Sequence, residues 1–434
     1  MTEAKGKRIL EWIKTALIVL LAISALLLGW RTGLFNDFSS AIPLFGNMAE
    51  LMRGASGTGT TESGGVSHKE AAARPLTIVI TDEEGGRYGV RYNTDERNDV
   101  YNRTSSILGE ALGSASVPLE ISESEWRAAL ARPGVYFEYI TPVSLSVLDG
   151  WLDVRLPEMV KDILLRRVFV AFGEDRSRVY YQDVDNHLFF VADTASSAGK
   201  AQELEMYSAN GAQFAFETGI SAAENAPYML ILPGNEYPDV HAASAGSAEE
   251  LLDIVIYAMG HGNETYTPPY YSNDGTLVSV GTQFRVRADA FGSVIYSRTE
   301  ALSANDAGKA PDESEMIEMA RRIAYATVGA VSSSAEVFFE SLEYSTDRSL
   351  SVLFGYYIAG GCIHLYEDIY AAKVTFTDGL LTDVELNFRN FSLSGEYIKL
   401  IPERQALASA GGEFFLCYSD TGSERPQPSW VLYD

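Results

Sequence analysis

Histidine is scarce in this sequence, with five residues in 434. Histidine is the side chain that most often serves as a general base or a metal ligand near neutral pH. His261 and Glu264 form a close histidine–carboxylate pair, but they follow Gly260 at the expected end of a helix, where loop polarity explains them. We therefore expect no metal site and no cofactor.

Cysteine is rarer still, since Cys362 and Cys417 are the two in the chain. Neither neighbourhood has the C-x-x-C spacing of a zinc or redox site. Two interpretations stay open: a disulfide between them, which would stabilise the fold by about 2 to 4 kcal/mol, or two separate buried thiols that act as small hydrophobes.

Basic residues are greatly outnumbered, with 33 lysines and arginines against 59 aspartates and glutamates, for a net charge of −26. A chain of this charge repels the phosphates of nucleic acids and the headgroups of anionic lipids. We therefore expect no nucleic-acid partner.

Catalytic motifs are also missing. The sequence contains no G-x-S-x-G, no H-E-x-x-H and no phosphate-binding P-loop. Ser197 and Lys200 match an S-x-x-K, but no later K-T-G strand accompanies them. We expect a protein that is not an enzyme. An exported hydrolase would need paired carboxylates in one cleft, which a structure can reveal.

One long apolar run is present, Thr15–Trp30, which carries no charge. It would span about 24 Å as a helix, and about 33 Å if it begins at Ile9, against a hydrocarbon layer of about 30 Å. A cleaved signal peptide and a buried core helix are the rival interpretations, and we favour a retained membrane anchor. The residues expected at the two membrane interfaces are Trp12, Lys14, Trp30 and Arg31.

The orientation of this anchor follows from its flanking charges. Lys5, Lys7, Arg8 and Lys14 precede most of the apolar run, whereas Arg31 alone follows closely. Basic residues stay on the cytoplasmic side. We therefore expect a single-pass membrane protein, with its N-terminus on the cytoplasmic side and the bulk of the chain outside.

Small residues recur every fourth position near the end of the anchor, at Ala25, Gly29 and Gly33. They fall along one side of a helix, and small residues at this spacing let two helices approach closely in lipid. We interpret them as a packing face for a partner's membrane helix.

Composition divides the chain into four parts. Residues 1–35 form the cytoplasmic tail and anchor, and residues 36–75 form a flexible linker that contains the glycine-rich stretch GASGTGTTESGGVS (54–67). The rest is predicted as two α+β regions, 76–244 and 245–434. The boundary between them rests on a linker-like passage at Pro238–Ser247.

The ectodomain pattern is that of antiparallel strand pairs with intervening helices. Leu76–Tyr92 reads as a hairpin around a Glu-Gly-Gly turn, and capping boxes at Ser122–Glu125 and Ser247–Glu250 begin two helices. Further pairs are predicted at Thr282–Arg298 and Lys373–Arg389, with a long helix over Pro311–Ala330 between them. This order indicates an α+β fold built on antiparallel sheets, in two or more domains.

Several of these segments together resemble the bacterial YycH/YycI family. The resemblance rests on Glu125-Trp126-Arg127 before VYFEYI and Pro142, on Asp289–Gly292 before SVIYSR, and above all on the stretch 351–391 followed by Ile401–Leu407. The glycine-rich linker departs from the usual pattern of the family, which puts signalling through a stiff stalk in doubt.

The resemblance implies a non-enzymatic, membrane-anchored regulator that binds a two-component sensor histidine kinase, and a related accessory protein, through the membrane helix and the ectodomain. The C-terminal region would be the YycI-like part. An alternative is an extracytoplasmic protein that binds a ligand or a cell-wall polymer, with Tyr270 and Tyr271 beside Thr267–Pro269 as a stacking platform.

Overall fold

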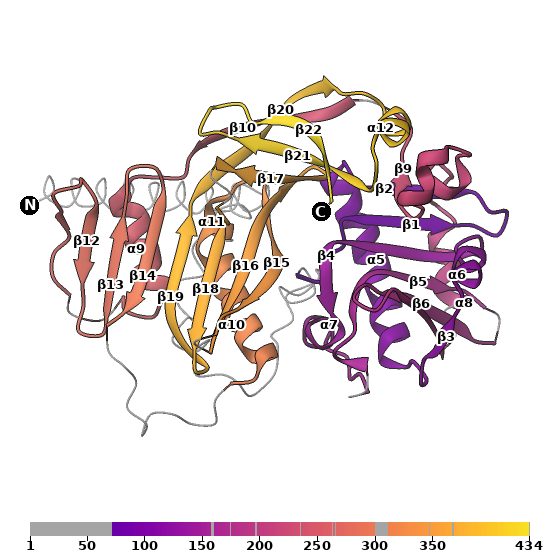
Figure 1. Cartoon of the computed structure of the whole chain (residues 1–434), viewed down its shortest axis with the longest axis horizontal. Helices are drawn as coiled ribbons and strands as arrows, with labels where there is room; N and C mark the ends of the chain where they lie inside the picture. The colour runs from indigo at the N-terminus through magenta and orange to yellow at the C-terminus, as the bar shows by residue number, and fades with distance from the viewer. Residues whose placement is uncertain are drawn as a thin grey trace, which may run out of the picture. The chain divides into compact units, whose positions relative to one another are not determined.

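This computed structural model describes residues 72–433, apart from 158–159, 174, 196–197, 235, 263, 265, 300–310, 347 and 367–368. Every element named below lies in one compact unit, Thr60–Met259 and Asn263–Asp434. The described residues form an α+β fold with antiparallel sheets, as the sequence predicts (Figure 1).

The first sheet has seven strands among the described residues, in the order β2-β1-β4-β5-β6-β7-β3, and every pair is antiparallel. Its strands are β1 (Thr77–Thr81), β2 (Arg87–Val90), β3 (Leu119–Ile121), β4 (Gly134–Ser144), β5 (Leu164–Ala171), β6 (Ser177–Asp183) and β7 (Leu188–Thr194). The predicted hairpin is β1–β2: Asp82 accepts hydrogen bonds from the amides of Glu84 and Gly86 and so closes its turn.

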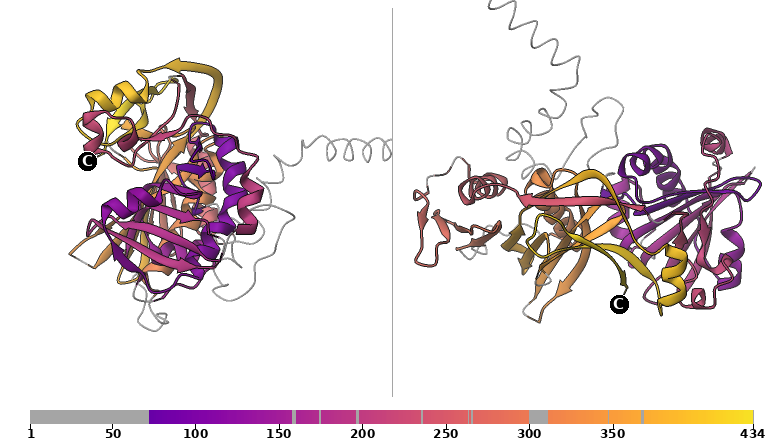
Figure 2. Two further views of the ribbon diagram at one scale, coloured as in Figure 1. Left: turned by 90° about the vertical axis from the view of Figure 1, so that its right-hand side faces the viewer. Right: turned by 90° about the horizontal axis from the view of Figure 1, so that it is seen from above.

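Helices cover both faces of this sheet (Figure 2). Side chains of α5 (Thr94–Gly113) pack with Ile78 and Phe137 on one face. The other face, which carries Val79 and Tyr136, packs against Trp126 of α6 (Glu123–Ala129). The short elements α7 (Leu145–Leu152), α8 (Ala198–Ala201), β8 (Gln213–Phe214) and β9 (Leu230–Ile231) complete this part of the chain.

The second sheet has eleven strands among the described residues, in the order β11-β12-β13-β14-β19-β18-β16-β17-β21-β22, with β15 paired to β16. They are β11 (Tyr270–Tyr271), β12 (Leu277–Val280), β13 (Phe284–Ala288), β14 (Ser293–Arg298), β15 (Glu336–Tyr344), β16 (Ser349–Ile358), β17 (Gly361–Leu365), β18 (Ala372–Thr377), β19 (Leu380–Asn387), β21 (Phe414–Asp420) and β22 (Gln427–Leu432). The predicted pairs at 282–298 and 373–389 are confirmed as β13–β14 and β18–β19.

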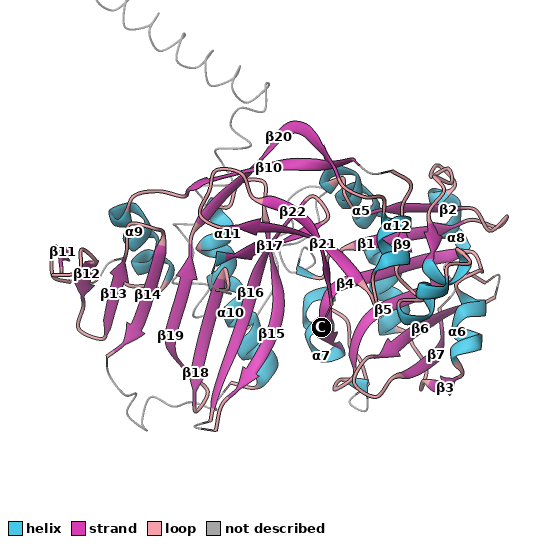
Figure 3. Cartoon of the chain, turned by 45° about the horizontal axis from the view of Figure 1, so that its top comes forward, coloured by secondary structure: helices cyan, strands magenta, loops and turns pink. Residues whose placement is uncertain are grey.

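Helices cover one face of the second sheet (Figure 3). They are α9 (Ala248–Ala258), α10 (Glu313–Ala326) and α11 (Val328–Val331). The capping box at Ser247 and Glu250 is confirmed at the start of α9, as is the one at Ser122 and Glu125 before α6. The helix predicted over 311–330 is interrupted at Thr327, whose φ of −110° and ψ of −93° are not helical.

The linker-like passage at Pro238–Ser247 is mostly a strand, which corrects that prediction. β10 (Glu236–Ser244) pairs with β20 (Arg389–Lys399) as a two-stranded sheet. Pro238 suggested a linker because proline cannot donate to a strand ladder, yet it lies where the register shifts, a position that tolerates proline. One cluster of buried apolar side chains includes residues from both sides of position 245, and the boundary there stays a prediction.

Candidate functional site

The residues predicted to form the membrane anchor lie outside the described part of the chain. They are Ala25, Gly29 and Gly33 of the packing face and Trp12, Lys14, Trp30 and Arg31 at the interfaces. Among the helices that the structure describes, none is both long and apolar enough to cross a bilayer.

The two cysteines lie side by side as free thiols. Cys362 of β17 and Cys417 of β21 are register partners on parallel strands. The structure therefore has two free thiols on neighbouring strands, which agrees with the second of the two interpretations that the sequence left open. Burial raises the pKa of both thiols, which keeps them protonated and unreactive.

Three arginines and three glutamates form a buried ion cluster, which we define as Arg91, Glu138, Arg166, Arg167, Glu403 and Glu413. Glu138 of β4 is 1% exposed. Its carboxylate lies 3.1 Å from guanidinium nitrogens of Arg91, which follows β2, and of Arg167 on β5. A buried carboxylate needs such partners because leaving water costs it several kcal/mol.

Glu413 joins the C-terminal part of the chain to this cluster. Its two carboxylate oxygens accept hydrogen bonds from Arg166 at 3.1 and 3.2 Å, and one also accepts from Arg167. Burial alone would raise the pKa of Glu413, but Arg167 and Arg166 outweigh it and lower that pKa to about 2. This carboxylate therefore stays ionised at any ordinary pH.

Glu403, the first residue of α12 (Glu403–Ser409), is the third carboxylate of the cluster. It is fully buried, lies 3.5 Å from Arg91, and accepts hydrogen bonds from the Leu232 amide at 2.5 Å and from the Tyr92 hydroxyl. Burial raises its pKa in spite of these partners. The six groups are paired with one another and mostly buried, with Glu413 the most exposed at 17% of its side chain, so the cluster can hold elements together.

Two further contacts tie the second sheet to the first. Glu336 of β15 accepts hydrogen bonds from Arg74 at 2.9 Å and from Arg97 of α5 at 2.6 Å. At the β16–β17 turn, Ala359 and Gly360 both have positive φ, and a Cβ on Gly360 would lie 2.9 Å from the Tyr92 Cα. The turn thus lies directly against the backbone of Tyr92, two residues after β2 ends.

Glu340 is the described carboxyl group whose pKa is moved furthest toward neutrality. It lies where β15 shifts register against β16, and a Cβ on Gly355 would be 2.7 Å from its Oε2. Burial raises the pKa of Glu340 to about 7. The group is therefore neutral in acid and ionises, at a cost, as the pH rises through 7.

Glu340→Gln is expected to raise the free energy of unfolding at pH 8 by up to about 3 kcal/mol and to change it little at pH 4. A carboxyl whose pKa is higher in the folded state stabilises the fold below its unfolded pKa, and that contribution is lost as the pH rises past the folded value. Urea unfolding at both pH values measures the effect. Glu343→Gln, which breaks an ion pair with Lys373, serves as the control on the same strand. Equal differences from the wild type at pH 4 and pH 8 would contradict the prediction.

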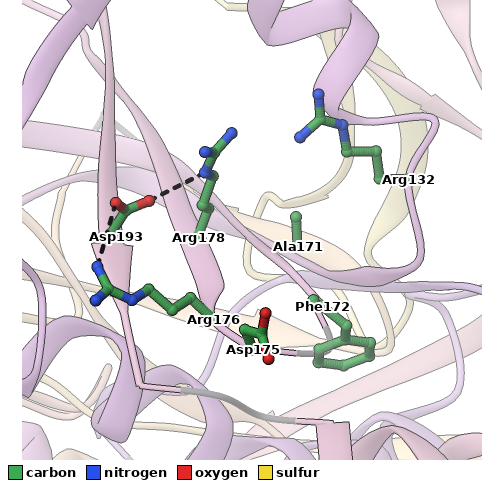
Figure 4. Close-up of a pocket in the computed structure, with 8 residues that line it drawn as sticks. Arg132, Ala171, Phe172, Asp175, Arg176, Arg178 and Asp193 are labelled. Carbon is green, nitrogen blue, oxygen red and sulfur yellow. Dashed lines mark hydrogen bonds and ion pairs between the residues drawn. The ribbon is translucent and has the colours of Figure 1, made fainter.

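A cavity of about 560 Å³ lies on the first sheet and is lined by Arg132, Arg176 and Arg178 (Figure 4). Asp193 lies 3.0 Å from Arg178 and 4.0 Å from Arg176. Arg176 and Arg178 are exposed and share this one carboxylate, whereas Arg132 donates a hydrogen bond to the Tyr180 hydroxyl at 3.2 Å. Exposed, shared pairs of this kind are typical of a solvated surface rather than of a specific anion site.

The predicted tyrosine platform is not formed. Tyr270 and Tyr271 are adjacent residues of the edge strand β11, so their side chains point to opposite faces of the sheet. They are 50% and 63% exposed, and the Tyr271 hydroxyl donates a hydrogen bond to Glu249 at the start of α9. A polymer ligand could therefore not stack on both rings together.

Metal-ligand geometry is absent from the described ranges of 72–433, where no three His, Cys, Asp or Glu side chains are grouped as ligands would be. The charged clusters that are present are paired internally. Sequence reasoning missed the ion cluster because its partners are far apart in the chain, as Arg167 and Glu413 are.

Comparison with known proteins gives a fold but no sequence relative. No family model and no curated protein matches the chain. The crystal structure of YycH from Bacillus subtilis is similar, with a TM-score of 0.53 and 8% identity over 84% of this chain and 94% of that one. An uncharacterized protein from Eubacterium rectale covers 45% of this chain and 76% of its own at 10% identity, with a TM-score of 0.28, too low to indicate a shared fold. The chain therefore has a YycH-like fold.

Proposed function

We propose that this protein is a membrane-anchored, extracytoplasmic regulator that binds a two-component sensor histidine kinase and is not itself an enzyme. The similarity of its fold to YycH over 84% of the chain carries the proposal. The same family was indicated by sequence segments distributed through the ectodomain. A related accessory protein is a further proposed partner.

The arrangement of charges supports an interaction role over a catalytic one. In the buried ion cluster, each carboxylate contacts at least one arginine, and the charges of the six residues cancel. Such a cluster fixes the relative position of strands and helices. A rigid ectodomain can bias a kinase by binding its two states unequally.

The apolar run Thr15–Trp30 supports placement at the membrane. A retained helix there would fix the ectodomain at the outer side of the bilayer and would bring Ala25, Gly29 and Gly33 against a helix of the kinase. The N-terminal sequence of the mature protein distinguishes this placement from cleavage and secretion.

Gly29→Leu is expected to reduce co-purification of the kinase from detergent-solubilised membranes about tenfold, equivalent to about 1.4 kcal/mol, because a large side chain blocks close helix approach. Kinase autophosphorylation in reconstituted membranes should lose its dependence on the regulator in parallel. Leu27→Phe, on the opposite side of the helix, is the matched control and should leave both measurements unchanged. If the Gly29→Leu variant matches the wild type in both measurements, the proposed contact in the membrane is wrong.

A further inference from the structure

The β13–β14 turn, Asp289–Gly292, is held in one conformation by its own side chain. Asp289 Oδ1 accepts hydrogen bonds from the amides of Phe291 at 2.8 Å and Ser293 at 2.9 Å. The Asp289 amide also donates to the Ser293 carbonyl at 2.9 Å. The carboxylate thus satisfies two backbone donors that a hairpin turn would otherwise leave to water.

The same turn is fixed to the end of β19. The Gly292 carbonyl accepts a hydrogen bond from the Phe388 amide at 2.8 Å. Gly292 has a φ of 96°, and a Cβ there would lie 2.5 Å from the Phe388 carbonyl oxygen, so a side chain is excluded. The turn is therefore a rigid support and not a mobile loop tip.

This rigid support presents Phe291, which is 88% exposed, the largest value among the exposed large hydrophobic residues in the described part of the chain. Full burial of a phenylalanine is worth about 1.5 to 3 kcal/mol. The isolated protein gains almost none of this free energy, because the ring is exposed even though hydrogen bonds hold the backbone of its turn. The gain becomes available when another surface covers the ring.

Strand register places a second exposed aromatic residue at the same end of the sheet. Tyr271 pairs with Leu277, and Leu277 pairs with Ala288, the residue before the turn. Figure 3 shows β11 beside the β12–β13–β14 part of the sheet, the region that carries both residues. Tyr271 is 63% exposed and its ring is held by the hydrogen bond to Glu249.

The charge at this end of the sheet is acidic. Asp274 lies in the turn between β11 and β12, Asp289 in the turn that carries Phe291, and Glu249 beside Tyr271. One arginine, Arg287, lies 3.3 Å from Asp274 and is thereby paired. Together with the net charge of −26, these carboxylates disfavour an anionic lipid surface or a nucleic acid.

We infer that the rim formed by Tyr271, Asp274, Asp289 and Phe291 is a docking surface for a protein partner, with Phe291 inserted in an apolar pocket that basic side chains surround. A rigid aromatic anchor loses little conformational entropy on binding, and such residues dominate the energy of protein interfaces. The inference does not depend on which protein is bound.

The test uses the full-length protein in the membranes of cells that produce it. A photo-crosslinking amino acid, p-benzoylphenylalanine, replaces Phe291 in one sample and Tyr344 in the control. Tyr344 is 68% exposed and pairs with Leu350 at the end of the sheet opposite to the one that carries Phe291. One discrete protein adduct is expected from position 291 and not from position 344. Adducts with lipid alone, or the absence of any protein adduct, would overturn the inference.

Binding of the purified crosslinked partner to the full-length protein in detergent then supplies the quantitative readout. Phe291→Ser should weaken binding about tenfold or more, Phe291→Trp should retain it, and Tyr344→Ser should leave it unchanged. Added salt should weaken wild-type binding. Equal affinity of the Phe291→Ser variant and the wild type would overturn the docking surface.

The outcomes separate this inference from the proposed function. A partner that is not a kinase but requires Phe291 would leave the docking surface standing and count against regulation of a kinase. Co-purification of a kinase that depends on Gly29 but not on Phe291 would support regulation of a kinase and count against the docking surface.

Discussion

Glu138→Ala is expected to lower the free energy of unfolding by about 3 to 5 kcal/mol, enough to remove much of the stability of an ordinary domain. The substitution leaves Arg91 and Arg167 buried and deprives each of the carboxylate that lies 3.1 Å away. Arg91 keeps Glu403 and Arg167 keeps Glu413, but the cluster is left with three buried arginines and two carboxylates. The excess buried charge keeps the cost of its removal from water, so the loss exceeds the strength of the ion pairs themselves.

Urea unfolding of the purified variant at pH 7 measures this loss. Asp99→Asn is the matched control, because it breaks the Asp99–Arg103 pair on the surface of α5, where both side chains are roughly half exposed. That change should cost less than about 1 kcal/mol. Similar losses for the two variants would show that water reaches the ion cluster.

Gly360→Val is expected to destabilise the protein by about 2 to 5 kcal/mol. Its φ of 82° is unfavourable for any residue with a Cβ, at a cost of about 1 to 2 kcal/mol. The new side chain would also meet the Tyr92 backbone, since a Cβ would be only 2.9 Å from the Tyr92 Cα, and overpacking of this kind costs about 1 to 3 kcal/mol more.

Gly395→Val separates these two causes. Gly395 of β20 has almost the same φ, 80°, but nothing lies within 4 Å of a Cβ there. Its replacement should therefore show the backbone cost alone, in the same thermal or urea unfolding measurement. If Gly395→Val costs as much as Gly360→Val, the contact with Tyr92 contributes nothing.

Elements defined by nearby residues could be predicted from the sequence. The Glu-Gly-Gly turn identified the β1–β2 hairpin, and serine–glutamate boxes marked the starts of α6 and α9. Each of these signals acts over three or four residues of the chain. The fold class followed from their order.

Elements that depend on distant partners could not be predicted. The strand β10 is stabilised by β20, about 150 residues later in the chain. Nothing in the composition of Pro238–Ser247 indicates that pairing. The helix α5 was also not predicted, although its signal is local: its N-cap is Asn93, whose side chain accepts a hydrogen bond from the Glu96 amide.

The residues of the candidate site were even harder to predict from the sequence. An arginine beside a strand is unremarkable in a sequence, and 59 acids offer each one many partners. Only the folded chain reveals that Arg166 shares Glu413 with Arg167, or that Phe291 stands exposed on a fixed turn. Exposure and long-range pairing are properties of the fold.

The position of Glu403 and Glu413 near the end of the chain has a consequence for how the protein matures. Arg91, Arg166 and Arg167 are synthesised hundreds of residues before these two carboxylates. A nascent or prematurely terminated chain that stops before residue 403 would hold those guanidinium groups without two of their three counter-ions. The first sheet can reach its final state only after the chain has been synthesised through residue 413, so products truncated before that point should be substrates for quality-control proteases.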